Sequence, residues 1–241
     1  MTIVKTSIGR RSFLKVSLTA GGGLVLGFSG LISCTNKSEA EILELPKEWF
    51  EINGYLKIGD NGVVTIMSPN PEIGQNVKTS MPMLVAEELD VDWKNVIVEQ
   101  APLNTTLYTR QLAGGSASIS QSWKGMRTAG ATPRQMLCEA AAAEWKVPVN
   151  EITTEAGTLH HKASGKSTSY GEMASAAAKV PVPKEVLLKN IKDFKIIGTP
   201  RKNVDGKNIV TGKPLFGLDY KKEGMLIAMI AQPPAFGLKL K

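Results

Sequence analysis

The sequence predicts an α+β fold in which hairpins of short strands are combined with two longer helices. Short β-rich runs flank turn residues at 55–67 and again at 152–161, which is the pattern of β-hairpins. Runs at 77–89 and 119–145 carry apolar residues three or four positions apart, which indicates helices with one buried face. The 241 residues, 42% of them apolar, suffice for one large domain or two ordinary ones.

Charge and cysteine content exclude some functional classes. The net charge is +7, but four of the positive charges lie in the first fifteen residues, so the remainder is only mildly basic. No other basic cluster alternates with aromatic residues, and nucleic-acid binding is therefore not predicted. The two cysteines, Cys34 and Cys138, lie in different contexts, so we expect neither a disulfide framework nor a thiolate metal site.

Residues 1–34 have the features of an export signal and are kept apart from the fold. Arg10 and Arg11 lie in the run Gly-Arg-Arg-Ser-Phe-Leu-Lys, which is a twin-arginine signature read by the export machinery for folded proteins. The mildly apolar run at 16–32 contains five glycines and is short for a transmembrane span. A transmembrane anchor with a basic flank is the alternative interpretation.

Cys34 ends a Leu-Ile-Ser-Cys sequence that resembles a lipoprotein signal box. In such signals the cysteine carries lipid and becomes the new N-terminus, which gives stable membrane anchoring. Residues 35–48 then form a tether that begins with a polar run. We therefore expect a periplasmic protein anchored through Cys34, and this export route commonly carries proteins that already hold a cofactor.

The first folded unit is expected at residues 49–182 and begins with the hairpin at 55–67. The loop at 68–80 follows its second strand and leads into the helix at 77–89. In this loop Gly74 permits close approach of the backbone, Gln75 offers an amide, and Asn76 lies at the helix start, where unpaired N–H groups favour an anion. This chemistry indicates a loop that binds a polar, phosphate-bearing ligand. An ordinary surface connection is the alternative.

A further strand is expected at 95–100, followed by an irregular segment. Gly114, Gly115 and Ser116 form a second small-residue turn, directly before the long helix that ends near Trp145. Pro133 is expected to kink or interrupt this helix, because proline lacks the N–H that the helix needs.

Three features of the remaining unit concern possible metal or reactive sites. Cys138 lies on the apolar side of the long helix and is expected to be a packed small hydrophobe. His160 and His161 are neighbours on the second hairpin, so they point to opposite faces and cannot form a joint metal site. No metal site is predicted. Ser169 and Glu172 have the spacing of a capping box, which opens a short helix.

A second unit is expected from residue 195 to residue 241. Residues 208–219 have the composition of turn-punctuated β-structure, and 225–231 is a continuous apolar run of strand length. A central strand with no partner after it cannot complete a sheet, so this unit is expected to be cut short.

With these motifs the chain resembles the molybdopterin-binding large subunit of the xanthine dehydrogenase and aldehyde oxidase family. The most similar branch is the exported isoquinoline 1-oxidoreductase β-subunit type, and the likeness runs from about Phe50 to Phe236. Residues 73–79 resemble the Gly-Gln-Gly loop that contacts the cofactor, with Asn76 at the third position. Residues 114–116 resemble another cofactor-contacting segment. Residues 209–217 resemble the opening of the a/b hammerhead domain.

The resemblance implies a molybdopterin cofactor and an incomplete a/b hammerhead-like, β-rich segment at 195–241. It implies oxidation of an aldehyde or of an N-heterocycle carbon, with oxygen from water. Electrons would leave through a small 2Fe–2S subunit, with a c-type cytochrome as a further candidate partner. The residues that it assigns to cofactor binding are Gly74, Gln75, Asn76, Gly114, Gly115 and Ser116.

No catalytic residue is assigned, because the family's general base is a carboxylate near the C-terminus of the full protein. We therefore expect the chain to be the N-terminal part of such a subunit, inactive without the C-terminal part that completes the cofactor pocket. The alternative is a non-catalytic exported lipoprotein that binds a partner or a small ligand.

Overall fold

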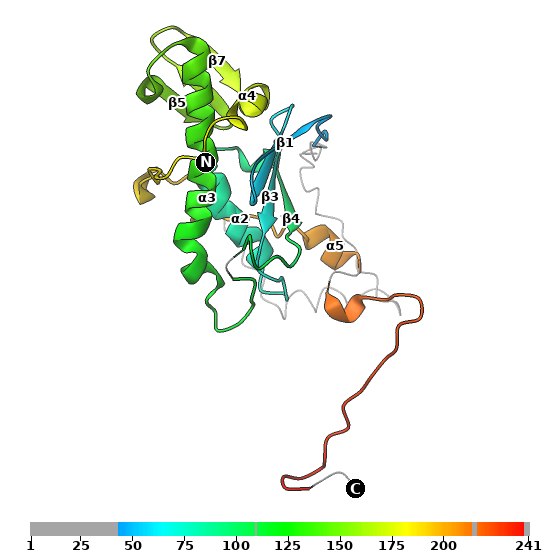
Figure 1. Cartoon of the computed structure of the whole chain (residues 1–241). Coiled ribbons are helices and arrows are strands. Elements are labelled where there is room, and N and C mark those ends of the chain that lie inside the picture. The colour runs from blue at the N-terminus through cyan, green and yellow to red at the C-terminus, as the bar shows by residue number, and fades with distance from the viewer. Residues whose placement is uncertain (1–42, 109, 214–215, 239–241) are drawn as a thin grey trace, which may run out of the picture. The chain divides into compact units, whose positions relative to one another are not determined.

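The computed structural model describes residues 43–108, 110–213 and 216–238 (Figure 1). The predicted export signal with Arg10, Arg11 and Cys34 lies outside these residues, as does most of the predicted tether. Among the described helices, none combines the length and the apolarity that crossing a bilayer requires.

The first sheet has four strands in sequence order. β1, β2 and β3 are antiparallel neighbours, which confirms the predicted first hairpin, whereas β4 runs parallel to β3. A parallel pair needs a crossover connection, and helix α2 (Val77–Leu89) supplies it. The strands are β1 (Trp49–Asn53), β2 (Leu56–Gly59), β3 (Val64–Ser68) and β4 (Val96–Gln100).

Two helices form the core together with this sheet. Helix α2 packs on β3 and β4 and against α3 (Ser118–Trp145), so both predicted helices are confirmed. The helices approach so closely that a Cβ added to Gly130 in α3 would collide with the main-chain carbonyl of Val85 in α2. Fully buried side chains of the sheet and of both helices meet here: Ile58, Val64, Ile66, Met81, Val85, Leu89 and Leu137.

Helix α3 continues through Pro133, so the predicted interruption is wrong. Proline cannot donate to the carbonyl four residues earlier, which is that of Ala129. The side chain of Asn53, in β1, donates to this carbonyl instead, with Nδ2 3.0 Å from the oxygen. A tertiary contact therefore satisfies the acceptor that proline leaves open.

A second sheet lies beyond the C-terminal half of α3, together with α4 (Tyr170–Ala177) (Figure 1). Its strands are β5 (Ile152–Glu155), β6 (Thr158–His161) and β7 (Lys166–Ser169), all antiparallel, which confirms the predicted second hairpin. The capping box at the start of α4 is also present. Its hydrogen bonds to Glu172, first from the main chain of Ser169, lower the pKa of this carboxyl.

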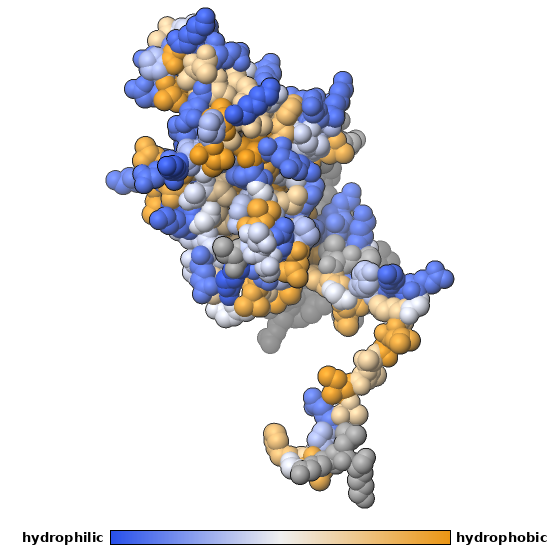
Figure 2. Space-filling model, in the orientation of Figure 1, coloured by the Kyte–Doolittle hydropathy of each residue, from blue (hydrophilic) through white to orange (hydrophobic). Residues whose placement is uncertain are grey.

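The last part of the described chain differs from the prediction. No strand forms within 208–219 or at 225–231 among the residues described there; residues 206–210 form the short helix α5 (Gly206–Val210) instead. Leu226 and Met229 are 92% and 93% exposed, and Figure 2 shows orange side chains along this segment. A strand needs a neighbour to bond with, and no described residue provides one. The α+β class itself is confirmed, while the hammerhead assignment stays a prediction.

Four single-turn 3₁₀ helices complete the described structure. They are η1 (Trp93–Asn95), η2 (Val149–Glu151), η3 (Ile191–Asp193) and η4 (Gly217–Asp219).

Candidate cofactor-binding site

The candidate site lies at one edge of the first sheet, where the parallel strands β3 and β4 end. Ser68 and Gln100, the last residues of these strands, lie opposite each other. The chain leaves β3 into residues 69–76, here called the Gln75 loop, and leaves β4 towards residues 114–116, the Gly115 turn. Ligands of such βαβ units bind outside the carboxyl ends of parallel strands. The topology therefore directs both sequence-predicted segments to one edge.

Asn70 joins the two segments. Its side chain is fully buried, and Nδ2 donates to the carbonyl of Leu112 at 2.9 Å and to Oγ of Ser118 at 3.1 Å. These acceptors lie on either side of the Gly115 turn, so Asn70 fixes the distance between turn and loop. Gln100 supports it, because its Nε2 donates to the carbonyls of Ser68 and Asn70.

The Gln75 loop is closed by its own side chains. Gly74 has φ = 102° and Asn76 has φ = 64°, a left-handed conformation that asparagine tolerates better than most residues. The main-chain N–H of Ile73 donates to Oε1 of Gln75, and Nε2 of Gln75 donates to the carbonyl of Pro71. The side chain of Gln75 is therefore exposed but turned back on the loop.

The start of α2 is not the open anion site that the sequence predicts. Asn76 makes no side-chain cap, and the carboxylate of Glu72 accepts main-chain hydrogen bonds instead, including one from Lys78 at 2.9 Å. An internal anion thus occupies the helix N-terminus. Sequence reasoning did not single out Glu72 or Asn70; the only signals were an acid shortly before a helix and an amide between two prolines.

The Gly115 turn leads into a helix end that is open. Gly115 and Ser116 both have positive φ, 63° and 52°, and residues 114–116 are exposed. Ala117, at the N-cap of α3, offers no side-chain cap, and the first turn of α3 contains no acidic residue. The free N–H groups and the dipole of α3 therefore favour a negatively charged group at this position.

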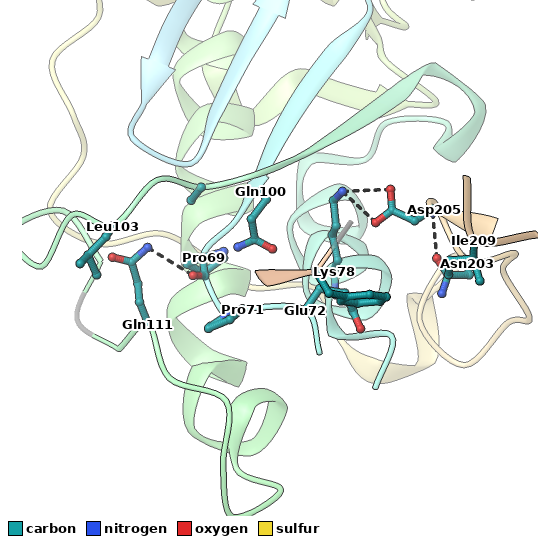
Figure 3. A pocket seen from close by; sticks show the side chains of 12 residues that line it. Pro69, Pro71, Glu72, Lys78, Gln100, Leu103, Gln111, Asn203, Asp205 and Ile209 are labelled. Carbon is teal, nitrogen blue, oxygen red and sulfur yellow. Dashed lines mark hydrogen bonds and ion pairs between the residues drawn. The ribbon is translucent and has the colours of Figure 1, made fainter. Parts of the chain in front are cut away.

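A cavity of about 280 Å³ lies beside the Gln75 loop, between this loop, the segment after β4 and the side chains of Asn203, Asp205, Ile209 and Phe216 (Figure 3). Lys78 and Asp205 point towards each other across it, with Nζ 3.0 and 2.8 Å from the two carboxylate oxygens. The hydroxyl of Thr79 accepts a bond from the main chain of Val204. Neither Gln75 nor the Gly115 turn lines this cavity.

The described residues contain no group of three or more His, Cys, Asp or Glu side chains placed to hold a metal ion. His160 and His161 alternate in burial along β6, as expected for opposite faces. His161 is buried and bonded to Glu151 and Ser164. Burial raises the pKa of the Cys138 thiol to about 11, so this side chain is neutral near pH 7, as expected for a packed hydrophobe.

A family profile described as "Molybdopterin cofactor-binding domain" matches residues 18–211, which is most of the chain. The chain belongs to this family. The resemblance inferred from the Gln75 loop and the Gly115 turn is thereby confirmed, and molybdopterin is the cofactor of the domain.

Three relatives share this part of the sequence. The beta chain of the isoquinoline 1-oxidoreductase of Brevundimonas diminuta is 30% identical over 77% of this chain and 29% of its own length. A membrane-bound aldehyde dehydrogenase [pyrroloquinoline-quinone] of Gluconacetobacter polyoxogenes is 27% identical over 98% of this chain and 31% of that protein. A nicotinate dehydrogenase subunit of Pseudomonas putida is 27% identical over 78% of this chain and 16% of its own length. The chain thus spans less than a third of each.

Solved structures give partial matches to the molybdopterin-binding domain. Quinoline 2-oxidoreductase of Pseudomonas putida 86 superposes with a TM-score of 0.41 at 20% identity, over 52% of this chain and 16% of that one. A Cu,Mo carbon monoxide dehydrogenase superposes with a TM-score of 0.42 at 18% identity, over 54% of this chain and 18% of that one.

The edge of the sheet fits a molybdopterin on observations of its own. The amide oxygens of Asn70 and Asn76 are buried without a partner among the described residues, and buried acceptors of this kind call for donors. A Cβ placed on Gly74, Gly114 or Gly115 would meet no described atom within 4 Å, so the main chain at these three glycines is open to approach. Acceptors suited to the N–H groups of a pterin ring thus lie on the same edge of the first sheet as the uncapped N-terminus of α3, which favours an anion.

Proposed function

We propose that the chain is part of a molybdenum hydroxylase subunit that oxidises an aldehyde or a carbon of an N-heterocycle, with water as the source of oxygen. The observation that carries the proposal is the Asn70 bridge, which holds the two cofactor-resembling segments together at the edge of β3 and β4. Family membership and the names of the relatives support it. Because the chain spans less than a third of each relative, the activity is proposed for the complete subunit.

The residues of this chain would bind and orient the cofactor. Bound molybdopterin would supply the two-electron redox chemistry. The side chain of Gln75 would turn outward and offer its amide to the cofactor, and the free N–H groups at the start of α3 would hold an anionic group. Asn70 would keep these two contacts at a fixed separation, because it belongs to the Gln75 loop and its side chain bonds to the chain on both sides of the Gly115 turn.

Electron transfer requires a partner in this proposal. The two cysteines of this part of the subunit cannot by themselves supply the four thiolates of a common iron–sulfur cluster. We propose that a small 2Fe–2S subunit accepts the electrons, with a c-type cytochrome as a further partner. Two of the relatives are named as subunits, which is consistent with such an assembly.

The test uses the complete subunit with its partner in isotope-labelled water. We expect turnover of an N-heteroaromatic compound or an aldehyde, with label in the product, and extracted cofactor of the pterin type. The Gln75→Ala variant is expected to bind molybdopterin about tenfold more weakly, because losing a polar contact costs roughly 1.5 kcal/mol. Mass spectrometry of the extracted cofactor, per mole of subunit, measures its retention.

The matched control is Gln232→Ala, since Gln232 is exposed on the C-terminal segment far along the chain from either cofactor segment. Its cofactor content should equal that of the unmodified subunit. Unlabelled product, or a quinone in place of a pterin, would contradict the proposed chemistry. Equal cofactor content in the Gln75 and Gln232 variants would contradict the role of the loop.

We also propose export by the twin-arginine route and anchoring through lipidated Cys34, on the strength of the sequence motifs alone. Replacing Arg10 and Arg11 by lysine should retain the protein in the cytoplasm, because the receptor reads the arginine pair. Cys34→Ser should still be exported but recovered in the soluble periplasmic fraction. Fractionation with immunodetection measures both, and membrane retention of Cys34→Ser would indicate a transmembrane anchor instead.

A further inference from the structure

We propose that Glu72 is the positioning residue of the Gln75 loop: its carboxylate fixes the main chain around Gln75 and closes the N-terminus of α2 to anionic ligands. The inference rests on the proposed function only in taking Gln75 as the cofactor contact. The contacts of Glu72 themselves are independent of any cofactor.

The carboxylate of Glu72 accepts three main-chain hydrogen bonds around Gln75. Oε1 of Glu72 accepts the main-chain N–H of Gly74 at 2.7 Å and of Asn76 at 3.0 Å, and Oε2 accepts that of Lys78 at 2.9 Å. The three donors lie on both sides of Gln75. Hydrogen bonds to an ionised acceptor are stronger than neutral ones, and a negative charge at this end of a helix is favourable.

The side chain of Gln75 stays free to move while the main chain on either side of it is held. The side chain of Gln75 bonds only to Ile73 and Pro71 among the described residues, and none of the Glu72 contacts involves Gln75. The amide of Gln75 can therefore leave its two bonds and turn towards a ligand while Glu72 keeps the main chain in place. Without Glu72, the left-handed conformations at Gly74 and Asn76 would lose the bonds that hold them, and the loop would lose its order.

The N-termini of the two helices at the site, α2 and α3, differ in their capping. At α2 the Glu72 carboxylate takes the N–H groups of Asn76 and Lys78, and its charge repels a second anion. At α3 neither a side-chain cap nor an acidic first turn is present. A ligand with one anionic end is thereby directed to α3, and Glu72 determines the orientation in which it binds.

Two substitutions separate the contacts in a hydrogen-exchange experiment on the full chain. In Glu72→Gln the amide oxygen can still accept the main-chain N–H groups of Gly74 and Asn76. The NH₂ group of the new side chain faces the main-chain N–H of Lys78 and cannot accept it. We expect the Lys78 amide to exchange about tenfold faster in this variant, with the other two unchanged. In Glu72→Ala all three amides should exchange faster. The buried Tyr170 amide, bonded to Gly157, reports whether the fold is intact.

Titration with inorganic phosphate tests the closure of α2. We expect phosphate to shift the amide resonances of residues 76–78 in a saturable way in Glu72→Ala, and not in the unmodified chain. The control is Glu185→Ala, which removes an exposed carboxylate and should leave exchange and titration unchanged.

Unchanged exchange at all three amides in both Glu72 variants would overturn the proposal, as would equal phosphate shifts with and without Glu72. If Glu72→Ala fails to fold, the Lys78 amide in Glu72→Gln still decides the matter. These results do not depend on the cofactor. A failure of Gln75→Ala to change molybdopterin content would therefore refute the proposed cofactor contact of Gln75, and unlabelled product would refute the proposed function, while either result leaves the role of Glu72 in the loop as measured.

Discussion

Replacing Glu87 by alanine is expected to lower the free energy of unfolding by about 3–5 kcal/mol, a large part of the stability of an ordinary domain. Glu87 lies near the end of α2, is 1% exposed, and holds a distant segment of the chain. Its Oε2 accepts the main-chain N–H groups of Lys195, Ile196 and Ile197 at 2.9, 2.6 and 3.0 Å. Removing the carboxylate leaves these three main-chain donors unpaired, and Lys189 keeps only Asp90 of its two carboxylate partners.

Two neighbouring carboxylates, those of Glu88 and Asp90, hold the same distant segment through Lys189. Glu88, fully buried, accepts from Arg127 and from the main chain of Lys189. Asp90 pairs with the Lys189 ammonium at 2.7 Å. Burial acts to raise the pKa of the Asp90 carboxyl. The hydrogen bond and the positive charge of Lys189 outweigh burial and hold this pKa below its ordinary value. The C-terminal end of α2 therefore fixes residues 189–197. From there the chain continues to Val204 and Asp205, which contact Thr79 and Lys78 in the first turn of the same helix.

Chemical denaturation of the full chain, followed by circular dichroism, measures the effect. Glu87→Gln should cost less, about 1–3 kcal/mol, because its amide oxygen can still accept the three main-chain bonds. Glu144→Ala removes an exposed carboxylate from α3 and should change the stability by less than about 0.5 kcal/mol. Equal losses for Glu87→Ala and Glu144→Ala would show that the buried carboxylate does not hold the segment.

Gly130→Ala is expected to lower the free energy of unfolding by about 2–3 kcal/mol, although alanine favours helices over glycine by about 1 kcal/mol. The added methyl group would lie against the carbonyl oxygen of Val85, closer than real Cβ contacts, and 3.0 Å from Cβ of Glu88. A main-chain carbonyl cannot rotate away as a side chain can. The helices must therefore separate, which opens the core between them.

The same helix offers a matched control. Gly125 also lies in α3, but a Cβ placed there meets nothing within 4 Å. Gly125→Ala should therefore raise the stability by about 0.5–1 kcal/mol through helix propensity alone. Thermal and chemical unfolding of both variants provide the comparison. If Gly130→Ala were as stable as Gly125→Ala, α2 and α3 could not pack as closely as they do in the structure.

Much of the first domain could be predicted from local sequence patterns. Both hairpins, the strand at 96–100, helices α2 and α3 and the capping box at Ser169 follow from periodicity and turn chemistry. The strands expected at 208–219 and 225–231 were wrong, because composition reports a preference for strands but not whether a neighbouring strand is present. Pro133 was misjudged for a similar reason, since the Ala129 carbonyl that Pro133 leaves without its helical donor accepts from the side chain of Asn53 in β1.

By itself, the sequence determined the two hairpins, β4, helices α2, α3 and α4, the family, the cofactor and the two segments that resemble its contacts, because spacing and turn residues are local properties. Strands β1 and β7 were not predicted. Only the tertiary structure decided how the two cofactor-resembling segments are used. It brought them to one sheet edge through the parallel β3–β4 pair and joined them through Asn70. It also placed the Glu72 carboxylate at the N-terminus of α2 and left the N-terminus of α3 without a side-chain cap. These outcomes depend on which donors and acceptors meet after folding, and no local pattern specifies that.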